Sequence, residues 1–119
     1  MIGIDLIQIK RIESMLERFG KKSLNRFINE DEIVLSKSNS KTIAGFWAAK
    51  EAISKALGVG ISNECGFKDI TIQKTQRNAP YFTLTSTLVK KFNIKDTSLS
   101  ITHDGEYAIA VATLEKGEG

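Results

Sequence analysis

The chain has 119 residues, of which 41% are hydrophobic and 26% are charged, and its formal net charge at pH 7 is +3. This composition is typical of a globular protein and excludes wholesale disorder, and the length fits a single domain, residues 1–119. One proline excludes collagen-like and proline-rich chains, and one cysteine, Cys65, excludes a disulfide framework and a zinc site with several thiolates.

The ends of the chain are the next feature. The first seven residues are apolar but lack the basic residues of a signal peptide and include Asp5, and no apolar stretch reaches the roughly 18 residues of a membrane helix. We therefore expect a cytoplasmic protein with no membrane association. The cytoplasm is a reducing compartment, which also fits the single cysteine. The tail from residue 115 is glycine-rich and charged, and it is expected to fray.

The first half of the chain predicts a strand followed by helices. Alternation over residues 2–7 predicts a strand in which Ile2, Ile4 and Leu6 share one face and Asp5 lies on the other. Helical spacing follows from about residue 9 until Gly20. The apolar positions of this helix are Ile12, Met15, Leu16 and Phe19.

Two more helices are predicted after it. Asn29 and Glu32 form a capping-box pattern for a short helix to about residue 36, and residues 38–40 can cap a helix from 41 to 57 that ends at Gly58. Glu51 and Lys55 lie together at the edge of its apolar arc, beside alanines that leave room for an approaching group. Lys50 falls inside that arc, so it must extend to solvent or meet an anion. The arc comprises Ile43, Phe46, Trp47, Ile53 and Leu57.

The second half predicts mainly β-structure. Strands are expected over residues 69–74, from Pro80, over 98–103 and over 106–114, with a short helix at 85–93 and a two-residue turn at Asp104–Gly105. The predicted fold is therefore α+β, with an N-terminal strand and helices packed on a mostly antiparallel sheet.

The positive charge is concentrated in one segment. Residues 10–26 hold six basic and two acidic residues, a net charge of +4, so the rest of the chain nets −1. Such a segment is either a solvated helix face or a binding surface for an anionic partner.

Asp5 is the first candidate for chemistry, because a carboxylate in an apolar strand is costly without a partner. It could pair with a lysine, lie at an exposed edge, or converge with Glu51. Two carboxylates about 4 Å apart repel by roughly 4 kcal/mol at an effective dielectric constant of 20, so convergence requires a cation between them. Two hard oxygen ligands, with no His/Cys cluster at ligand spacing, suit magnesium better than zinc.

The other candidates are less specific by themselves. Lys55 four residues after Glu51 is a common helix pair. Gly58 and Gly60 are explained by a helix end and do not form a Walker-type phosphate loop. His103 is the only histidine, and a lone histidine is more often structural than catalytic.

Together these segments resemble holo-[acyl-carrier-protein] synthases, which are small 4′-phosphopantetheinyl transferases. The similarity lies in the order and spacing of motifs over nearly the whole chain. The motifs are Gly-Ile-Asp-Leu-Ile-Gln-Ile-Lys-Arg-Ile at 3–12, Phe-Trp-Ala-Ala-Lys-Glu-Ala-Ile-Ser-Lys-Ala-Leu-Gly at 46–58, Asp-Ile-Thr-Ile at 69–72, Pro80, Ser-Ile-Thr-His-Asp at 100–104 and Tyr-Ala-Ile-Ala at 107–110.

The resemblance implies an enzyme that moves 4′-phosphopantetheine from coenzyme A to a serine of apo-acyl carrier protein, releases adenosine 3′,5′-bisphosphate and so supports fatty acid biosynthesis. It also implies a homotrimer with sites between subunits and no nucleic-acid partner. The implied roles are Mg²⁺ ligation and catalysis for Asp5 and Glu51, catalysis and phosphate binding for Lys55, coenzyme A binding for Lys50, Gly58, Pro80 and His103, and carrier-protein docking for Arg11, Met15 and Arg18. Asn78-Ala79-Pro80 departs from a family pattern that often places glycine before the proline, but asparagine tolerates the left-handed turn.

Three questions stay open at this stage. The general base could be Glu51, directly or through a metal-bound water, or else His103 or Asp104. A non-catalytic module whose basic helix binds nucleic acid is an alternative, opposed by aromatic residues at core spacings, Phe19 among them. An inactive relative that serves as a scaffold is the second alternative.

Overall fold

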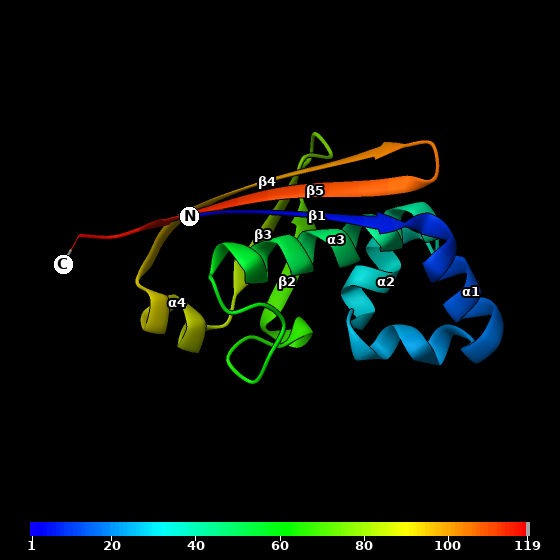
Figure 1. The fold of residues 1–119 in the computed structure, drawn as a ribbon, viewed down its shortest axis with the longest axis horizontal. Coiled ribbons are helices and arrows are strands. Elements are labelled where there is room, and N and C mark those ends of the chain that lie inside the picture. Colours follow the sequence, from blue (N-terminus) through cyan, green and yellow to red (C-terminus); the bar gives the residue numbers. More distant parts are fainter. Residues whose placement is uncertain (119) are drawn as a thin grey trace.

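The computed structural model describes residues 1–118, which form two antiparallel sheets and a set of helices around one long helix (Figure 1). The three-stranded sheet has the order β1-β5-β4, and the second sheet pairs β2 with β3. The expected α+β class with mostly antiparallel pairing is confirmed. The elements are β1 Ile2–Gln8, α1 Ile9–Phe19, the 3₁₀ helix η1 Lys21–Arg26, α2 Glu30–Ser36, α3 Ser40–Ala56, the 3₁₀ turn η2 Phe67–Asp69, β2 Ile70–Lys74, β3 Pro80–Leu84, α4 Ser86–Phe92, β4 Ile94–Asp104 and β5 Tyr107–Lys116.

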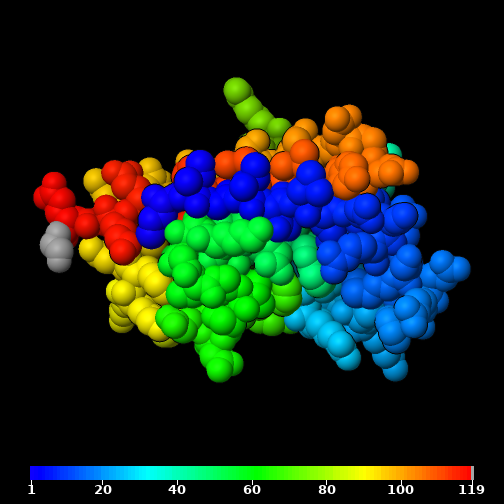
Figure 2. Space-filling model, viewed as in Figure 1, coloured from blue at the N-terminus to red at the C-terminus, as the bar shows by residue number. Residues whose placement is uncertain are grey.

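Strand β1 alternates between two environments, as its sequence predicts. Gly3 and Ile7 are buried and Asp5 is partly buried on the face that packs against α3. Ile2, Ile4 and Leu6 point the other way and are 71%, 60% and 54% exposed. In Figure 2 this strand, in dark blue, runs uncovered across the face of the molecule. The three-stranded sheet is therefore covered on one side only.

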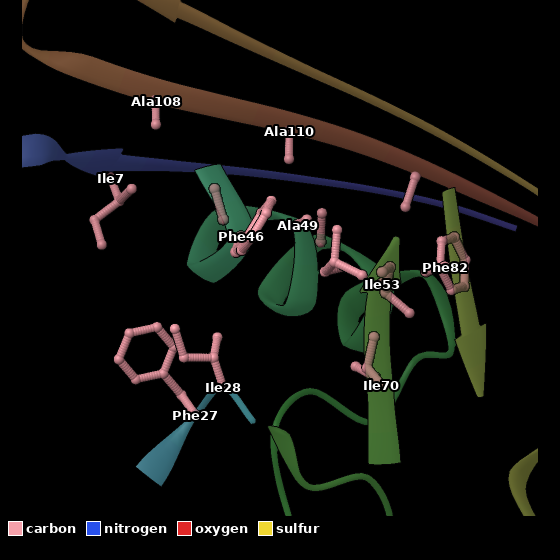
Figure 3. Packing of buried hydrophobic residues seen from close by; sticks show 14 of the residues in the cluster. Ile7, Phe27, Ile28, Phe46, Ala49, Ile53, Ile70, Phe82, Ala108 and Ala110 are labelled. Atoms are coloured by element: carbon pink, nitrogen blue, oxygen red, sulfur yellow. The ribbon is translucent and has the colours of Figure 1, made fainter. Parts of the chain in front are cut away.

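Helix α3 lies close against the covered face of that sheet because both surfaces are built from small residues. A Cβ atom at Gly3 would collide with the backbone carbonyl oxygen of Ala52. Ala108 and Ala110 of β5 point toward Phe46 and Ala49 of α3 (Figure 3). The alanines of α3 were expected to leave room for an approaching group. That expectation is wrong, because the alanines beside Glu51 and Lys55, Ala44 and Ala48, are 0% exposed.

The helix starts follow the capping chemistry in the sequence. Asn29 and Glu32 form the predicted capping box, with both side-chain to backbone hydrogen bonds at 2.9 Å. Asn39 caps α3 by accepting from the N–H groups of Lys41 and Thr42. The 3₁₀ helix η1 was not predicted. Within residues 1–118, no helix is both long enough and apolar enough to cross a bilayer.

The two β-turns position residues of interest. Asn78 adopts φ +66° in the turn between β2 and β3, so it takes the left-handed conformation expected of it. The turn between β4 and β5 lies one residue later than predicted. Asp104 pairs with Tyr107, and the loop is Gly105–Glu106, with Gly105 at φ +57°. A two-residue loop is confirmed, but its residues are corrected.

The C-terminal segment is more ordered than expected. Glu115 and Lys116 pair with Asp96 and Ile94 as the end of β5, and the N–H of Gly117 donates to the Asn93 carbonyl at 2.8 Å. The expectation of fraying from residue 115 is therefore wrong for residues 115–117, and residue 119 lies outside the described part of the chain.

Candidate active site

Asp5, Glu51 and Lys55 converge where β1 crosses the C-terminal half of α3. Lys55 Nζ lies 2.9 Å from Asp5 Oδ1 and also donates to the carbonyl of Ile4 at 3.2 Å. The Asp5 side chain is 16% exposed and the Lys55 side chain 52%. Asp5 therefore pairs with a lysine, as one of its considered environments, and that lysine is the one predicted to bind phosphate.

Glu51 is close enough to this pair to be affected by its charges. Burial raises the pKa of Glu51 above its ordinary value, the negative charge of Asp5 raises it further, and the positive charges of Lys55 and Arg11 oppose both effects. Within residues 1–118, no group of three or more His, Cys, Asp or Glu side chains is placed to hold a metal. The site therefore offers two hard carboxylates, one of which, that of Glu51, is partly removed from water.

Pro80 and His103 meet in a separate small pocket of about 180 Å³. Its walls come from α3, the β2–β3 hairpin and β4, and the other lining residues are Thr42, Phe46, Lys74, Asn78 and Ile101. His103 Nε2 lies 2.7 Å from the carbonyl oxygen of Lys41. Because a carbonyl only accepts, Nε2 carries a proton and donates it in this bond.

The small pocket and the carboxylates lie on the same face of the three-stranded sheet but on opposite edges. Asp5 is on β1, His103 is on β4, and β5 runs between them. With about 4.8 Å between neighbouring strands, the two edges are about 10 Å apart. The lining of this pocket, drawn from residues 1–118, includes neither Asp5 nor Glu51 nor Lys55.

The basic segment forms a grooved surface around α1 and η1. Arg11, Met15 and Arg18 line a hollow of about 290 Å³ together with Lys10, Ser14 and Phe19. A second hollow of about 320 Å³ is lined by Met15, Phe19, Lys22, Ser23 and Arg26. We call these two hollows the basic groove. The three residues predicted to dock a carrier protein thus share one hollow.

Phe19 corrects one expectation. It was placed with the core aromatics, but it is 65% exposed, and the guanidinium of Arg18 lies 5.4 Å from its ring centroid. Phe27 and Phe46 are each 1% exposed, as predicted. Helical spacing predicts that Phe19 lies on the same side of α1 as Ile12. It does not indicate how far along the helix the core extends, and the core ends before the last turn of α1. The aromatic spacing is therefore a weaker argument against nucleic-acid binding than the sequence indicated.

Lys50 is the second correction. Its side chain is fully buried and its ammonium forms an ion pair with the equally buried Glu32 at 2.8 Å. Burial lowers the pKa of Lys50, while the hydrogen bond and the charge of Glu32 act in the opposite direction. Lys50 meets an anion, as one of its two predicted options, but that anion belongs to the protein. A role in contacting coenzyme A does not fit a side chain that is 0% exposed.

Gly58 and Cys65 have local structural explanations. Gly58 adopts φ +84° and its N–H donates to the Lys55 carbonyl, which ends the helix turn that carries Lys55. Cys65 is buried, and burial together with the charge of Asp69 raises the pKa of its thiol to about 11. Neither observation adds a reactive group to the site.

Several residues of these surfaces were not singled out from the sequence. Thr42 and Lys74 line the small pocket, and Lys22 and Arg26 line the basic groove. The charge count of residues 10–26 contained a signal for Lys22 and Arg26. Thr42 and Lys74 had no local signal, because only the packing of the β2–β3 hairpin against α3 brings them together.

Comparison with known proteins agrees with this arrangement. Residues 1–112 match the family model of the 4′-phosphopantetheinyl transferase superfamily. The chain is 64% identical over 115 residues to the holo-[acyl-carrier-protein] synthase of Sulfurimonas denitrificans, covering 97% of this chain and 94% of that protein. It is 60% identical over 116 residues to the synthase of Nautilia profundicola, covering 98% and 100%.

Solved structures give the same assignment. The Helicobacter pylori synthase in complex with coenzyme A is 51% identical and superposes with a TM-score of 0.94, covering 97% of this chain and all of that one. The Bacillus anthracis synthase, solved in complex with CoA (3′,5′-ADP), is 36% identical with a TM-score of 0.80, covering 98% and 96%. The chain therefore belongs to the 4′-phosphopantetheinyl transferase superfamily, as an enzyme of its holo-[acyl-carrier-protein] synthase family.

Proposed function

We propose that this chain transfers 4′-phosphopantetheine from coenzyme A to a serine of apo-acyl carrier protein. The convergence of Asp5, Glu51 and Lys55 in a chain of this family is the observation that carries the proposal. The serine oxygen attacks the pyrophosphate phosphorus on the pantetheine side. The bond to the other phosphate breaks, and adenosine 3′,5′-bisphosphate leaves. In the cell we place this reaction in the cytoplasm, where it supports fatty acid biosynthesis.

The donor set at this site fits a magnesium ion. Asp5 and Glu51 supply hard carboxylate oxygens, and the pKa of Glu51 is raised first by its burial and then by the negative charge of Asp5. We infer that these two residues hold Mg²⁺, which when bound neutralises charge on the pyrophosphate during transfer. Two protein ligands leave coordination positions free for phosphate oxygens.

The other residues of the site bind and orient the substrates. Lys55 is half-exposed and its ammonium is free to move from Asp5 to a phosphate oxygen. We assign the role of accepting the serine proton to Glu51, directly or through a water, because its carboxylate lies at the site of transfer. His103 is engaged with the Lys41 carbonyl and lies at the opposite edge of the sheet, so we assign it with Pro80 to the adenosine end of coenzyme A. Asp104 is exposed at the hairpin and a poorer candidate for the base.

A homotrimer would bring the two parts of the site together. The small pocket and the carboxylates occupy opposite edges of one sheet, so a neighbouring chain could place its pocket beside the carboxylates of this one. The uncovered face of that sheet carries three exposed aliphatic residues of β1 together with Tyr107, an apolar patch typical of an interface. This patch supports the trimer that the family resemblance implies.

A mass assay tests the proposed function. Purified chain, coenzyme A, Mg²⁺ and apo-acyl carrier protein should give a carrier protein heavier by one phosphopantetheine group, together with free adenosine 3′,5′-bisphosphate. An inactive scaffold would bind coenzyme A without changing the mass of the carrier, and a nucleic-acid-binding module would do neither. A carrier whose mass stays unmodified in the presence of both substrates would contradict the proposal.

Reversing one charge in the basic groove should weaken docking selectively. Acyl carrier proteins are acidic, so Arg18→Glu places like charges opposite each other, and such a contact costs up to several kcal/mol. We expect the KM for carrier protein to rise at least about tenfold while the KM for coenzyme A changes less than about twofold. Lys95→Glu, at an exposed position of β4, makes the same change in net charge and serves as the control. Equal changes in both KM values would remove the docking role.

Removing Lys55 should have opposite effects on metal binding and on turnover. In the metal-free chain Lys55 pairs with Asp5, so a divalent ion must displace it. An ion pair of this exposure is worth up to about 1 kcal/mol, so Lys55→Met is expected to tighten Mg²⁺ binding by up to about fivefold while turnover falls. Calorimetric titration with Mg²⁺ alone measures this affinity. Arg11→Gln removes a nearby positive charge that does not pair with Asp5, and it should change the affinity less.

A further inference from the structure

Within residues 1–118, the Lys50–Glu32 ion pair is a fully buried pair of charges that the proposed reaction does not use. Both side chains are 0% exposed, and their charged atoms lie 2.8 Å apart. Removing two charges from water costs about as much as their attraction returns, so a buried ion pair is weak evidence for stability. Its position is more informative than its energy, because Lys50 immediately precedes Glu51 on α3.

The pair joins segments that are distant in sequence. Lys50 Nζ donates to the carbonyl of Phe27 at 2.7 Å, to Glu32 Oε1 at 2.8 Å and to the carbonyl of Phe67 at 3.1 Å. All three ammonium protons are therefore used. Glu32 Oε1 also accepts from the N–H of Asn29 at 2.9 Å, and Oε2 accepts from the N–H of Ile72 at 2.8 Å. We call this set of contacts the Lys50–Glu32 joint.

Each segment held by the joint leads to one part of the proposed site. Phe27 directly follows η1, whose residues Lys22 and Arg26 line the basic groove. Ile72 lies in β2, and the β2–β3 hairpin forms one wall of the small pocket. Helix α3 carries Glu51 and Lys55. Figure 3 places Phe27 and Ile28 on the side of α3 opposite β5. The joint therefore connects α3 to a segment that does not pack against the three-stranded sheet.

We infer that Lys50 and Glu32 are positioning residues that hold the basic groove and the pocket hairpin in a fixed relation to Glu51. This inference rests on the proposed function and names residues that align its two substrates. Apolar side chains of equal volume could fill the same space, but they lack directional bonds. Four hydrogen bonds between 2.7 and 3.1 Å fix the relative placement of three segments. A shift of about 1 Å in the approach of a substrate can cost about a hundredfold in rate.

The test separates alignment from stability. The double variant Lys50→Met with Glu32→Gln removes both charges together and so avoids leaving one buried charge unpaired. Leu88→Ala, at a buried position of α4 that lines neither the basic groove nor the small pocket, is the control for general loss of stability. All chains are assayed at a temperature at which melting curves show them more than about nine-tenths folded, with coenzyme A, Mg²⁺ and apo-carrier protein each varied in turn.

We expect kcat of the double variant to fall about 10- to 100-fold, with both KM values within about threefold of wild type, while Leu88→Ala keeps its kcat. A double variant with the kcat of Leu88→Ala would overturn the inference, as would a raised carrier-protein KM at unchanged kcat. If the double variant does not fold, Glu32→Asp decides by the same comparison, because it keeps both charges and shortens one arm of the joint. A wild-type chain that transfers nothing would instead contradict the proposed function, and the inference with it.

Discussion

Glu51→Gln is expected to reduce turnover by roughly 10²- to 10⁴-fold at saturating Mg²⁺, because charge neutralisation by a bound metal is worth several kcal/mol and the variant lacks one of the two carboxylates that would hold the ion. The same substitution is expected to stabilise the metal-free fold. Glu51 is half-buried beside Asp5, and both effects raise its pKa. A neutral amide avoids both costs.

The stabilisation should depend on pH in a defined direction. A carboxyl whose pKa is raised on folding favours the folded state below the ordinary value of 4.5 and loses that contribution as the pH rises through its folded-state pKa. The variant should therefore melt at a higher temperature than wild type at pH 7 in the presence of a chelator, and the difference should shrink as the pH approaches 4.5. Glu115→Gln, at an exposed position of β5, should show no such difference. Near-normal turnover of Glu51→Gln would contradict the metal assignment.

Gly3→Ala is expected to prevent the native packing of β1 on α3. The added methyl group would collide with the backbone oxygen of Ala52 and lie 2.7 Å from the backbone nitrogen of Ala56. Both atoms belong to the helix backbone, so no side chain can rotate away. We expect a cost above the roughly 1–3 kcal/mol usual for overpacking, seen as a large fall in melting temperature or in soluble yield.

Gly66→Ala is the matched control for this substitution. A Cβ atom at Gly66 would meet only Asp69 Oδ2, at an ordinary contact distance of 3.6 Å, and its φ of −86° suits any residue. This variant should keep nearly the melting temperature of wild type. If Gly3→Ala had the same melting temperature as Gly66→Ala, β1 and α3 could separate without loss of the fold.

Local chemistry predicted the elements of this fold well. The capping box of Asn29 and Glu32, the cap at Asn39 and the alternation of β1 depend on neighbours within a few residues, and all are observed. The hairpin turn was misplaced by one residue because Asp104-Gly105 and Gly105-Glu106 both supply a glycine to a two-residue loop. Strand pairing across the whole hairpin determines which of the two is used.

Contacts between distant segments could not be predicted in this way. The sequence placed Lys50 on the apolar arc of α3 but gave no sign that its anion would be Glu32, eighteen residues away, whose local role in a capping box was already complete. The alanines of α3 could accommodate either a ligand or a strand, and only the collision that a Cβ atom at Gly3 would cause identifies the strand. The contact between Asp5 and Lys55, at 2.9 Å, is observed, whereas a metal held jointly by Asp5 and Glu51 stays a prediction.

The alternation of β1 places two demands on a single heptapeptide. Odd-numbered positions 3, 5 and 7 serve the contact with α3 and the acidic site, and even-numbered positions 2, 4 and 6 present the uncovered apolar face. Deleting or inserting one residue inside this strand would exchange the two sets of positions. A carboxylate would then point to the outer surface, and an isoleucine would take its place beside Glu51 and Lys55.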